Sequence, residues 1–200
     1  LQRNPFSSGG GTAIRLAKSQ ETWPGRLNLG VNRAYRKGTL RSEGPLEGRL
    51  SRYTAACGPV IYRGDNFPKG YQGNSFICEP SGNFIRRNVH IENSGNIIAE
   101  NAEKESEWMS SSDERFRPVN LYNGPSGGLY IVDMYRGIVQ HRIYLTSYLR
   151  NQAESRGLEK DIDNGRIYRV VYKGNISSTQ NLAKASSNQL ISALSNNNGW

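Results

Sequence analysis

The sequence predicts an all-β fold: a partial β-propeller of about two blades, with a helical insertion and the start of a C-terminal α-helical repeat region. From position 53 onward, short runs rich in β-branched and aromatic residues alternate with tight turns. A propeller blade is a four-stranded antiparallel sheet of this kind. The composition agrees, because 22 glycines and 11 tyrosines among 200 residues are typical of many short strands and turns.

Residues 1–52 predict an irregular segment. Glycine and proline interrupt it repeatedly, as at Gly9–Gly11, Pro24–Gly25 and Gly44–Pro45, and these residue types mark turns and loops. We therefore expect loops and part of a blade here, ahead of the regular propeller region at 53–176.

The first blade is predicted from four short runs joined by tight turns. The third run alternates clearly, because Phe84, Arg86 and Asn88 fall on one face of an extended chain and Ile85 and Arg87 on the other. The predicted strands are Tyr53–Tyr62, Asn74–Glu79, Asn83–Ile91 and Asn96–Ala99.

A second set of strands follows an acidic connection at 101–114. Its members are predicted at Arg115–Tyr122, Gly128–Asp133 and Arg166–Tyr172. Apolar residues near helical spacing predict an inserted helix at Ile143–Arg156, with Gly157 as its C-cap.

Residues 177–200 predict one or two short helices, with Ser187 as an N-cap. A short amphipathic helix cannot bury its apolar face alone, so we expect the first helix of a helical region that continues beyond Trp200. The chain starts with Leu1 rather than methionine and has no apolar leader. We therefore expect it to begin within a longer protein.

The formal net charge of +9 comes from scattered basic residues, whose longest runs are pairs such as Arg86-Arg87. A solvated basic surface explains this pattern better than a nucleic-acid site does. No stretch approaches the ~18 apolar residues that a membrane span needs. We expect neither a nucleic-acid partner nor a membrane span in this chain.

Two cysteines and two histidines limit metal chemistry. Cys57 and Cys78 are too few and too far apart for a zinc site or a haem-attachment motif, and His90 lies far from His141. No metal site is expected. The two cysteines fall on neighbouring predicted strands, where either a disulfide or two buried thiols fits.

Arg115 and Arg117 form the most suggestive local pattern. On a strand, side chains two positions apart share a face, so these two guanidinium groups would project together. An anionic ligand with several carboxylates would relieve their repulsion. Pairing with Asp113, Glu114 or Asp133 is the alternative, and the residues by themselves favour it.

Asp133 and Arg136 follow the second strand of this set. Polar residues at strand ends in a propeller often line the mouth of the central channel, which makes both residues candidates for that position. The alternative is a turn in which Asp133 bonds its own backbone.

Several stretches together resemble the membrane-bound dehydrogenases of planctomycetes, whose propeller is similar to that of soluble quinoprotein glucose and sorbosone dehydrogenases. The resemblance covers roughly residues 25–200. The stretches that carry it are Gly30–Arg33, Thr54–Pro59, Tyr62–Asp65, Phe76–Pro80, Gly82–Asn83, Asp113–Asn120, Leu129–Gly137 and Gly165–Val170.

The resemblance implies that a sugar or alcohol is oxidised by pyrroloquinoline quinone (PQQ) and that electrons pass to a c-type haem domain elsewhere in the full protein. Relatives hold PQQ carboxylates with an Arg-x-Arg on an inner strand, and Arg115 and Arg117 match that motif. A periplasmic or extracellular location is implied, with membrane association only through regions outside this chain.

The sequence departs from the family pattern at two turns. Relatives place a cofactor-binding lysine near the turn that here reads Pro80–Asn83, and Ser126 stands where aspartate is usual. The general-base histidine and the calcium ligands belong to earlier blades, and the haem motif is also outside this chain. The isolated chain is therefore expected to be inactive. The alternative function is a propeller without catalysis that binds a glycan or a protein partner.

Overall fold

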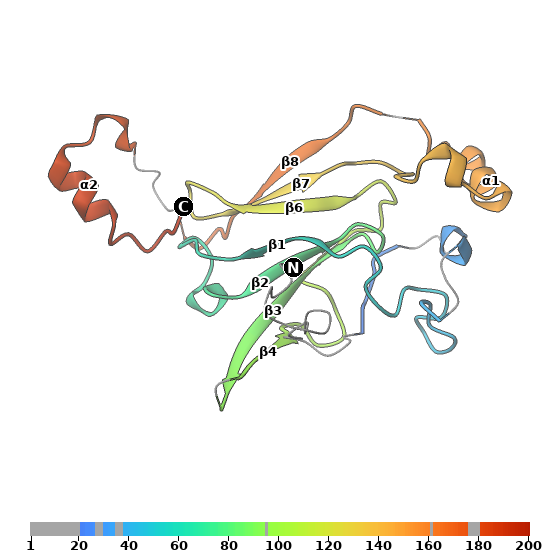
Figure 1. The fold of residues 1–200 in the computed structure, drawn as a ribbon, viewed down its shortest axis with the longest axis horizontal. Coiled ribbons are helices and arrows are strands. Elements are labelled where there is room, and N and C mark those ends of the chain that lie inside the picture. The colour runs from blue at the N-terminus through green and yellow to red at the C-terminus, as the bar shows by residue number, and fades with distance from the viewer. Residues whose placement is uncertain (1–20, 27–29, 35–37, 95, 161, 176–180) are drawn as a thin grey trace, which may run out of the picture.

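The computed structural model describes residues 21–26, 30–34, 38–94, 96–160, 162–175 and 181–200. Within them lie two antiparallel β-sheets and two short α-helices, and no closed barrel is formed (Figure 1). The loops predicted for residues 1–20, and residues 177–180 of the predicted helical region, lie outside the described part. The predicted mostly-β fold is therefore confirmed at this coarse level.

The first sheet is an antiparallel meander in the order β1-β2-β3-β4. All four strands predicted for it are present, although β1 starts later than expected. The short strand β5 pairs with the beginning of β3. The strands are β1 (Cys57–Ile61), β2 (Ser75–Glu79), β3 (Phe84–Asn93), β4 (Asn96–Asn101) and β5 (Met109–Ser110).

The late start of β1 has a local cause. The backbone N–H groups of Thr54 and Ala55 donate to the carboxylate of Glu79, at 3.1 and 3.0 Å. Residues before Cys57 therefore bond to a side chain at the end of β2 rather than to a neighbouring strand.

The second sheet has three strands in the order β6-β7-β8. They are β6 (Pro118–Asn123), β7 (Leu129–Asp133) and β8 (Arg166–Val170). The prediction that the first of them starts at Arg115 was wrong, because the Arg115 N–H donates to Asp113 Oδ1 and the Phe116 N–H to the Asp113 carbonyl. This turn delays pairing with β7 until Pro118.

The main core lies between the two sheets, where β1 and β2 contact β6 (Figure 1). Alternate residues of each strand face it, as the period of two requires. Its buried members are Tyr62, Phe67, Phe76, Cys78, Ile85, Phe116, Leu121, Leu129 and Ile131.

The predicted inserted helix is present as α1 (Ser147–Ser155), preceded by the 3-10 turn η3 (Arg142–Tyr144). Thr146 caps it by accepting from the Leu149 N–H, and Gly157 follows with a φ of +60°. A smaller core joins α1 to the 3-10 helix η1 (Val31–Ala34). The buried residues of that core are Val31, Leu145, Leu149, Ala153 and Leu158.

The C-terminal segment contains the 3-10 turn η4 (Leu182–Lys184) and α2 (Ser187–Ala193). The N-cap of α2 is Ser186, one residue before the predicted Ser187. Ser186 and Gln189 form a capping box, in which each side chain accepts from the other residue's backbone N–H.

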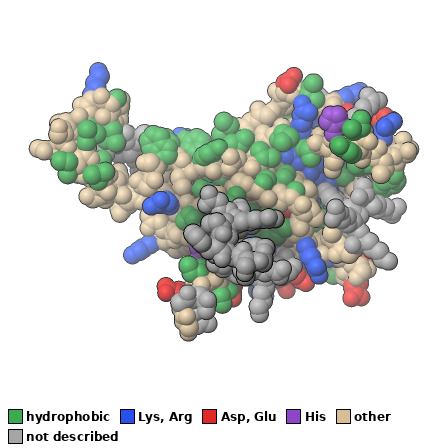
Figure 2. Space-filling model, in the orientation of Figure 1, with side chains coloured by type: hydrophobic (Ala, Val, Ile, Leu, Met, Phe, Trp, Pro, Cys, Tyr) green, Lys and Arg blue, Asp and Glu red, His purple; other side chains and the backbone are tan. Residues whose placement is uncertain are grey.

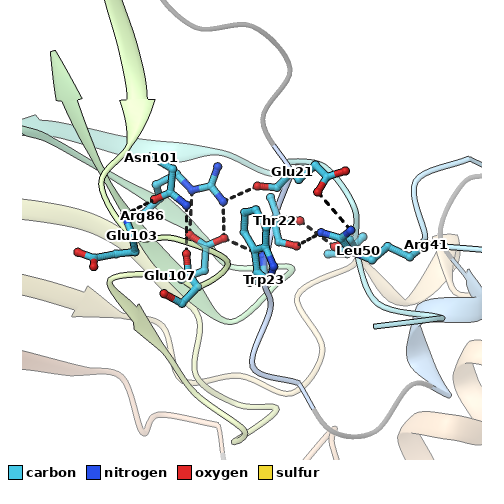
Figure 3. A network of polar contacts seen from close by, with 10 residues as sticks. Glu21, Thr22, Trp23, Arg41, Leu50, Arg86, Asn101, Glu103 and Glu107 are labelled. Atoms are coloured by element: carbon cyan, nitrogen blue, oxygen red, sulfur yellow. Dashed lines mark hydrogen bonds and ion pairs between the residues drawn. The ribbon is translucent and has the colours of Figure 1, made fainter. Parts of the chain in front are cut away.

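The N-terminal segment at 21–26 covers the other face of the first sheet (Figure 3). The guanidinium of Arg86 forms a fully buried ion pair with Glu107, with Nε and Oε2 2.9 Å apart, and donates to the Glu21 carbonyl. Glu107 in turn accepts from the Trp23 N–H at 2.9 Å. The short 3-10 helix η2 (Lys69–Tyr71) lies in the connection between β1 and β2.

Candidate functional site

The residues singled out in the sequence gather at the end of the second sheet nearest α1, where β6 begins and β7 ends (Figure 1). The Arg117 N–H donates to Asp133 Oδ1 over 2.7 Å. Arg136 follows three residues after the end of β7. The structure therefore brings Arg117, Asp133 and Arg136 together.

The guanidinium of Arg117 binds three backbone carbonyls. Nε donates to the Arg136 carbonyl at 2.9 Å, Nη1 to the Pro80 carbonyl at 2.6 Å, and Nη2 to the Gly137 carbonyl at 2.7 Å. Only 4% of the residue is exposed. Arg117 thus joins the turn between β2 and β3 in one sheet to the segment that follows β7 in the other.

Arg115 is half-buried and donates from Nη2 to the Gly157 carbonyl over 3.0 Å, which joins it to the end of α1. Two of the three carboxylates considered as its partners make the following contacts. Asp113 accepts from the Arg115 backbone N–H, and Glu114 forms an ion pair with Arg156. Because both arginines precede β6, the shared strand face expected for them is not formed.

Asp133 forms the turn that was the alternative to a channel position. Its Oδ1 accepts from the N–H groups of Arg117 and Tyr135, at 2.7 and 2.8 Å. The residue is 1% exposed, and its side chain falls on the strand face shared with Leu129 and Ile131. Within the described residues, Oδ2 has no hydrogen-bond partner.

Tyr135 is a site residue that sequence reasoning missed. Its φ of +47° lies in the left-handed region, which costs energy for a residue with a bulky side chain. Its hydroxyl donates to Asp113 Oδ2 at 2.9 Å, and the Arg166 guanidinium carbon lies 3.5 Å from its ring centroid. The hydrogen bond to Asp113 raises the pKa of Tyr135. Nothing in the sequence indicates a left-handed tyrosine here.

An open hollow of about 650 Å³ lies beside this cluster. Its apolar part comes from Val119, Val132, Met134 and Ile167. Charged residues border it, namely Arg136, Asp163 and Arg166. The guanidinium of Arg136 makes no hydrogen bond or ion pair to any described residue. We call Asp113, Tyr135, Arg136 and Arg166 the rim site.

A family model described as Domain of unknown function (DUF7133) matches residues 11–174. The chain belongs to the DUF7133 family. No curated protein and no solved structure matches the chain.

The geometry of this DUF7133 domain does not fit PQQ at the arginine pair. A carboxylate-rich cofactor needs guanidinium groups whose forked N–H donors face the ligand. In Arg117, three nitrogens already donate to carbonyls and the group is buried. Nη2 of Arg115 donates to the Gly157 carbonyl, and the nearby turn at Pro80–Asn83 has no lysine. We therefore assign no chemical step to PQQ here.

The described part of the DUF7133 domain holds no cluster of three or more His, Cys, Asp or Glu side chains placed for a metal ion. None of its helices is long and apolar enough to cross a bilayer.

Proposed function

We propose that this DUF7133 domain is part of a β-propeller that binds a sugar or another polyol at the rim site. The observation that carries the proposal is the stack of Asp113, Tyr135 and Arg166, in which the tyrosine has a strained backbone conformation. Beside it lies the guanidinium of Arg136, which has no partner among the described residues. Residues kept in strained conformations cluster at ligand sites.

The sheet arrangement supports the propeller part of the proposal. Each sheet is an antiparallel meander, and the two pack face to face with their first strands, β1 and β6, in contact. Successive blades of a propeller have this relation. The free face of the second sheet also carries exposed apolar side chains, such as Tyr122, that a further blade would cover.

The chemistry of the rim site suits a polyol. Sugar hydroxyls both donate and accept, so they match a site with carboxylate acceptors and guanidinium donors. The exposed carboxylate of Asp113 and the guanidinium of Arg136 offer these two functions. The apolar hollow next to Arg136 would contact the C–H face of a sugar ring.

The second candidate is a PQQ-dependent sugar or alcohol dehydrogenase, in which electrons pass to a c-type haem elsewhere in the protein. The sequence stretches that resemble quinoprotein dehydrogenases favour it, and Arg115 and Arg117 lie on the matching motif. Both candidates share the substrate class and a periplasmic or extracellular location. They differ in whether this chain contacts PQQ.

Calorimetric titration with a panel of neutral hexoses and hexuronates tests the first candidate. We expect saturable binding that weakens at least tenfold in Arg136→Ala, because one guanidinium hydrogen bond to a ligand contributes about 1.5–3 kcal/mol. Arg52→Ala is the matched control, since Arg52 is exposed and distant in sequence from the rim site. Absence of binding by the folded chain, or equal losses in both variants, would reject the rim site.

A parallel titration with PQQ and calcium separates the two candidates. The polyol proposal predicts no saturable PQQ binding. Saturable binding that is lost in Arg115→Ala would establish the quinoprotein function instead. Arg115 is the better variant because it is half-exposed, whereas loss of Arg117 disturbs three segments of the fold.

A further inference from the structure

Cys57 and Cys78 lie directly opposite each other in the first sheet. They are register partners in the antiparallel pair of β1 and β2, and both thiols are free. Residues directly opposite in such a pair point to the same face of the sheet. Two nucleophilic side chains from strands separated by a long connection are therefore brought side by side.

The surroundings of the pair confirm a common face. Cys78 is fully buried in the main core, and Cys57 packs against the same cluster while staying partly accessible. Burial raises the pKa of the Cys78 thiol, and the neighbouring Cys57 raises it further. An effect of Cys57 on Cys78 is expected when the two thiols lie close together.

The backbone spacing suits a covalent bond. Opposed residues in an antiparallel pair have Cα atoms roughly 4.5–5.5 Å apart, and disulfides span Cα distances of roughly 4.4–6.8 Å. Cys57 is also the first residue of β1 and precedes a register irregularity that ends at Val60. Gly58, with a φ of +53°, lies within that irregularity. The strand end can therefore adjust as the sulfur atoms approach.

We propose that Cys57 and Cys78 form a cross-strand disulfide when a disulfide oxidant is present. The thiolate of the more accessible Cys57 attacks the oxidant's S–S bond and releases one thiolate. The Cys78 thiolate, formed by loss of its proton to solvent, then attacks Cys57 Sγ and displaces the second. The cysteine pair loses two protons and two electrons, and the oxidant is reduced to two thiols.

The bond would hold β1 against β2 through the core rather than through the sheet ladder alone. It would close a loop containing residues 58–77, a segment that includes η2 and the turn-rich connection between the strands. Because burial disfavours the Cys78 thiolate, we expect slow oxidation of the folded chain and faster oxidation during refolding.

The test treats the whole chain with oxidised glutathione at alkaline pH, both folded and during refolding from denaturant. We expect an intact mass lower by two hydrogens and, in a non-reducing digest, a peptide that links Cys57 to Cys78. Oxidation should raise the melting temperature of the wild type by roughly 5–10 °C, while Cys57→Ser and Cys78→Ser show no such rise.

Three results would overturn the proposal. These are a persistent glutathione adduct on Cys57 without an internal link, a link only between separate chains, or two free thiols after refolding in the oxidant. The inference does not depend on sugar or PQQ binding, so its outcome is separate from that of the rim-site titrations.

Discussion

A single guanidinium group connects the two sheets at the rim. Arg117 donates to the carbonyls of Pro80, Arg136 and Gly137, which come from the β2–β3 turn and from the segment after β7. Arginine suits this role because its rigid, planar fork can reach several acceptors at once. In this Arg-x-Arg motif the second arginine therefore serves packing, where the resemblance to quinoprotein dehydrogenases implied ligand binding.

Arg117→Ala is expected to lower the free energy of unfolding by about 2–4 kcal/mol, because it leaves buried carbonyl groups without donors. Arg117→Lys should recover only part of the loss, since a point-like ammonium cannot reach all three carbonyls. Urea denaturation, monitored by tryptophan fluorescence, measures the free energy of unfolding of both variants. If Arg117→Ala keeps wild-type stability but loses affinity for PQQ, the arginine is a ligand-binding residue after all.

The sequence could not predict this use of the arginine pair. The carbonyls that accept from the guanidinium groups of Arg117 and Arg115 lie 19 to 42 positions away, and their location depends on the assembled fold. Tyr135 was missed because its left-handed conformation follows from long-range contacts, with Asp113 on one side and Arg166 on the other. The local sequence pattern indicates neither the carbonyl contacts of the arginines nor the conformation of Tyr135.

At the scale of the elements, the strands were the most predictable part. Alternation and tight turns located β2, β3, β6 and β7 within a few residues, because one face of each strand is buried and the turns between them are short. The errors fall where side chains replace ladder partners. Glu79 receives the N–H groups before β1, and Asp113 receives those before β6.

Glu79 gives the first sheet a pH dependence. Burial raises its pKa, although hydrogen bonds from Ala55, Thr54 and Ser81 lower it in part. The unfolded chain ionises at the ordinary pKa while the folded chain still holds the proton. The contribution to stability is therefore complete at pH values below the ordinary pKa and is lost as pH rises through the raised one.

We therefore expect the free energy of unfolding to fall as the pH rises above the ordinary carboxyl pKa of 4.5, and Glu79→Gln to flatten that part of the profile. Urea denaturation at a series of pH values measures the slope, and Glu100→Gln, at an exposed site on β4, serves as the control. A wild-type profile that rises with pH over this range would mean that the three N–H donors outweigh burial.

At the scale of the whole molecule, β8 leaves the second sheet open. Its pairing within the described residues is with β7 alone, and Ile167 is 68% exposed. Figure 2 shows hydrophobic side chains gathered over this sheet and around α2. An exposed strand edge with apolar neighbours is a template for association. In a complete propeller, a further strand would pair with the open edge of β8.

The isolated chain should therefore self-associate in a way that depends on concentration, and Ile167→Lys should reduce association by adding charge to the exposed edge strand. Sedimentation velocity over a range of concentrations measures this. Ile143→Lys is the matched control, because Ile143 is 75% exposed but lies in η3, away from the open edge. If both variants reduce association equally, general surface hydrophobicity drives it. If the wild type stays monomeric and melts cooperatively at high concentration, the two sheets are self-sufficient and the open-propeller interpretation is wrong.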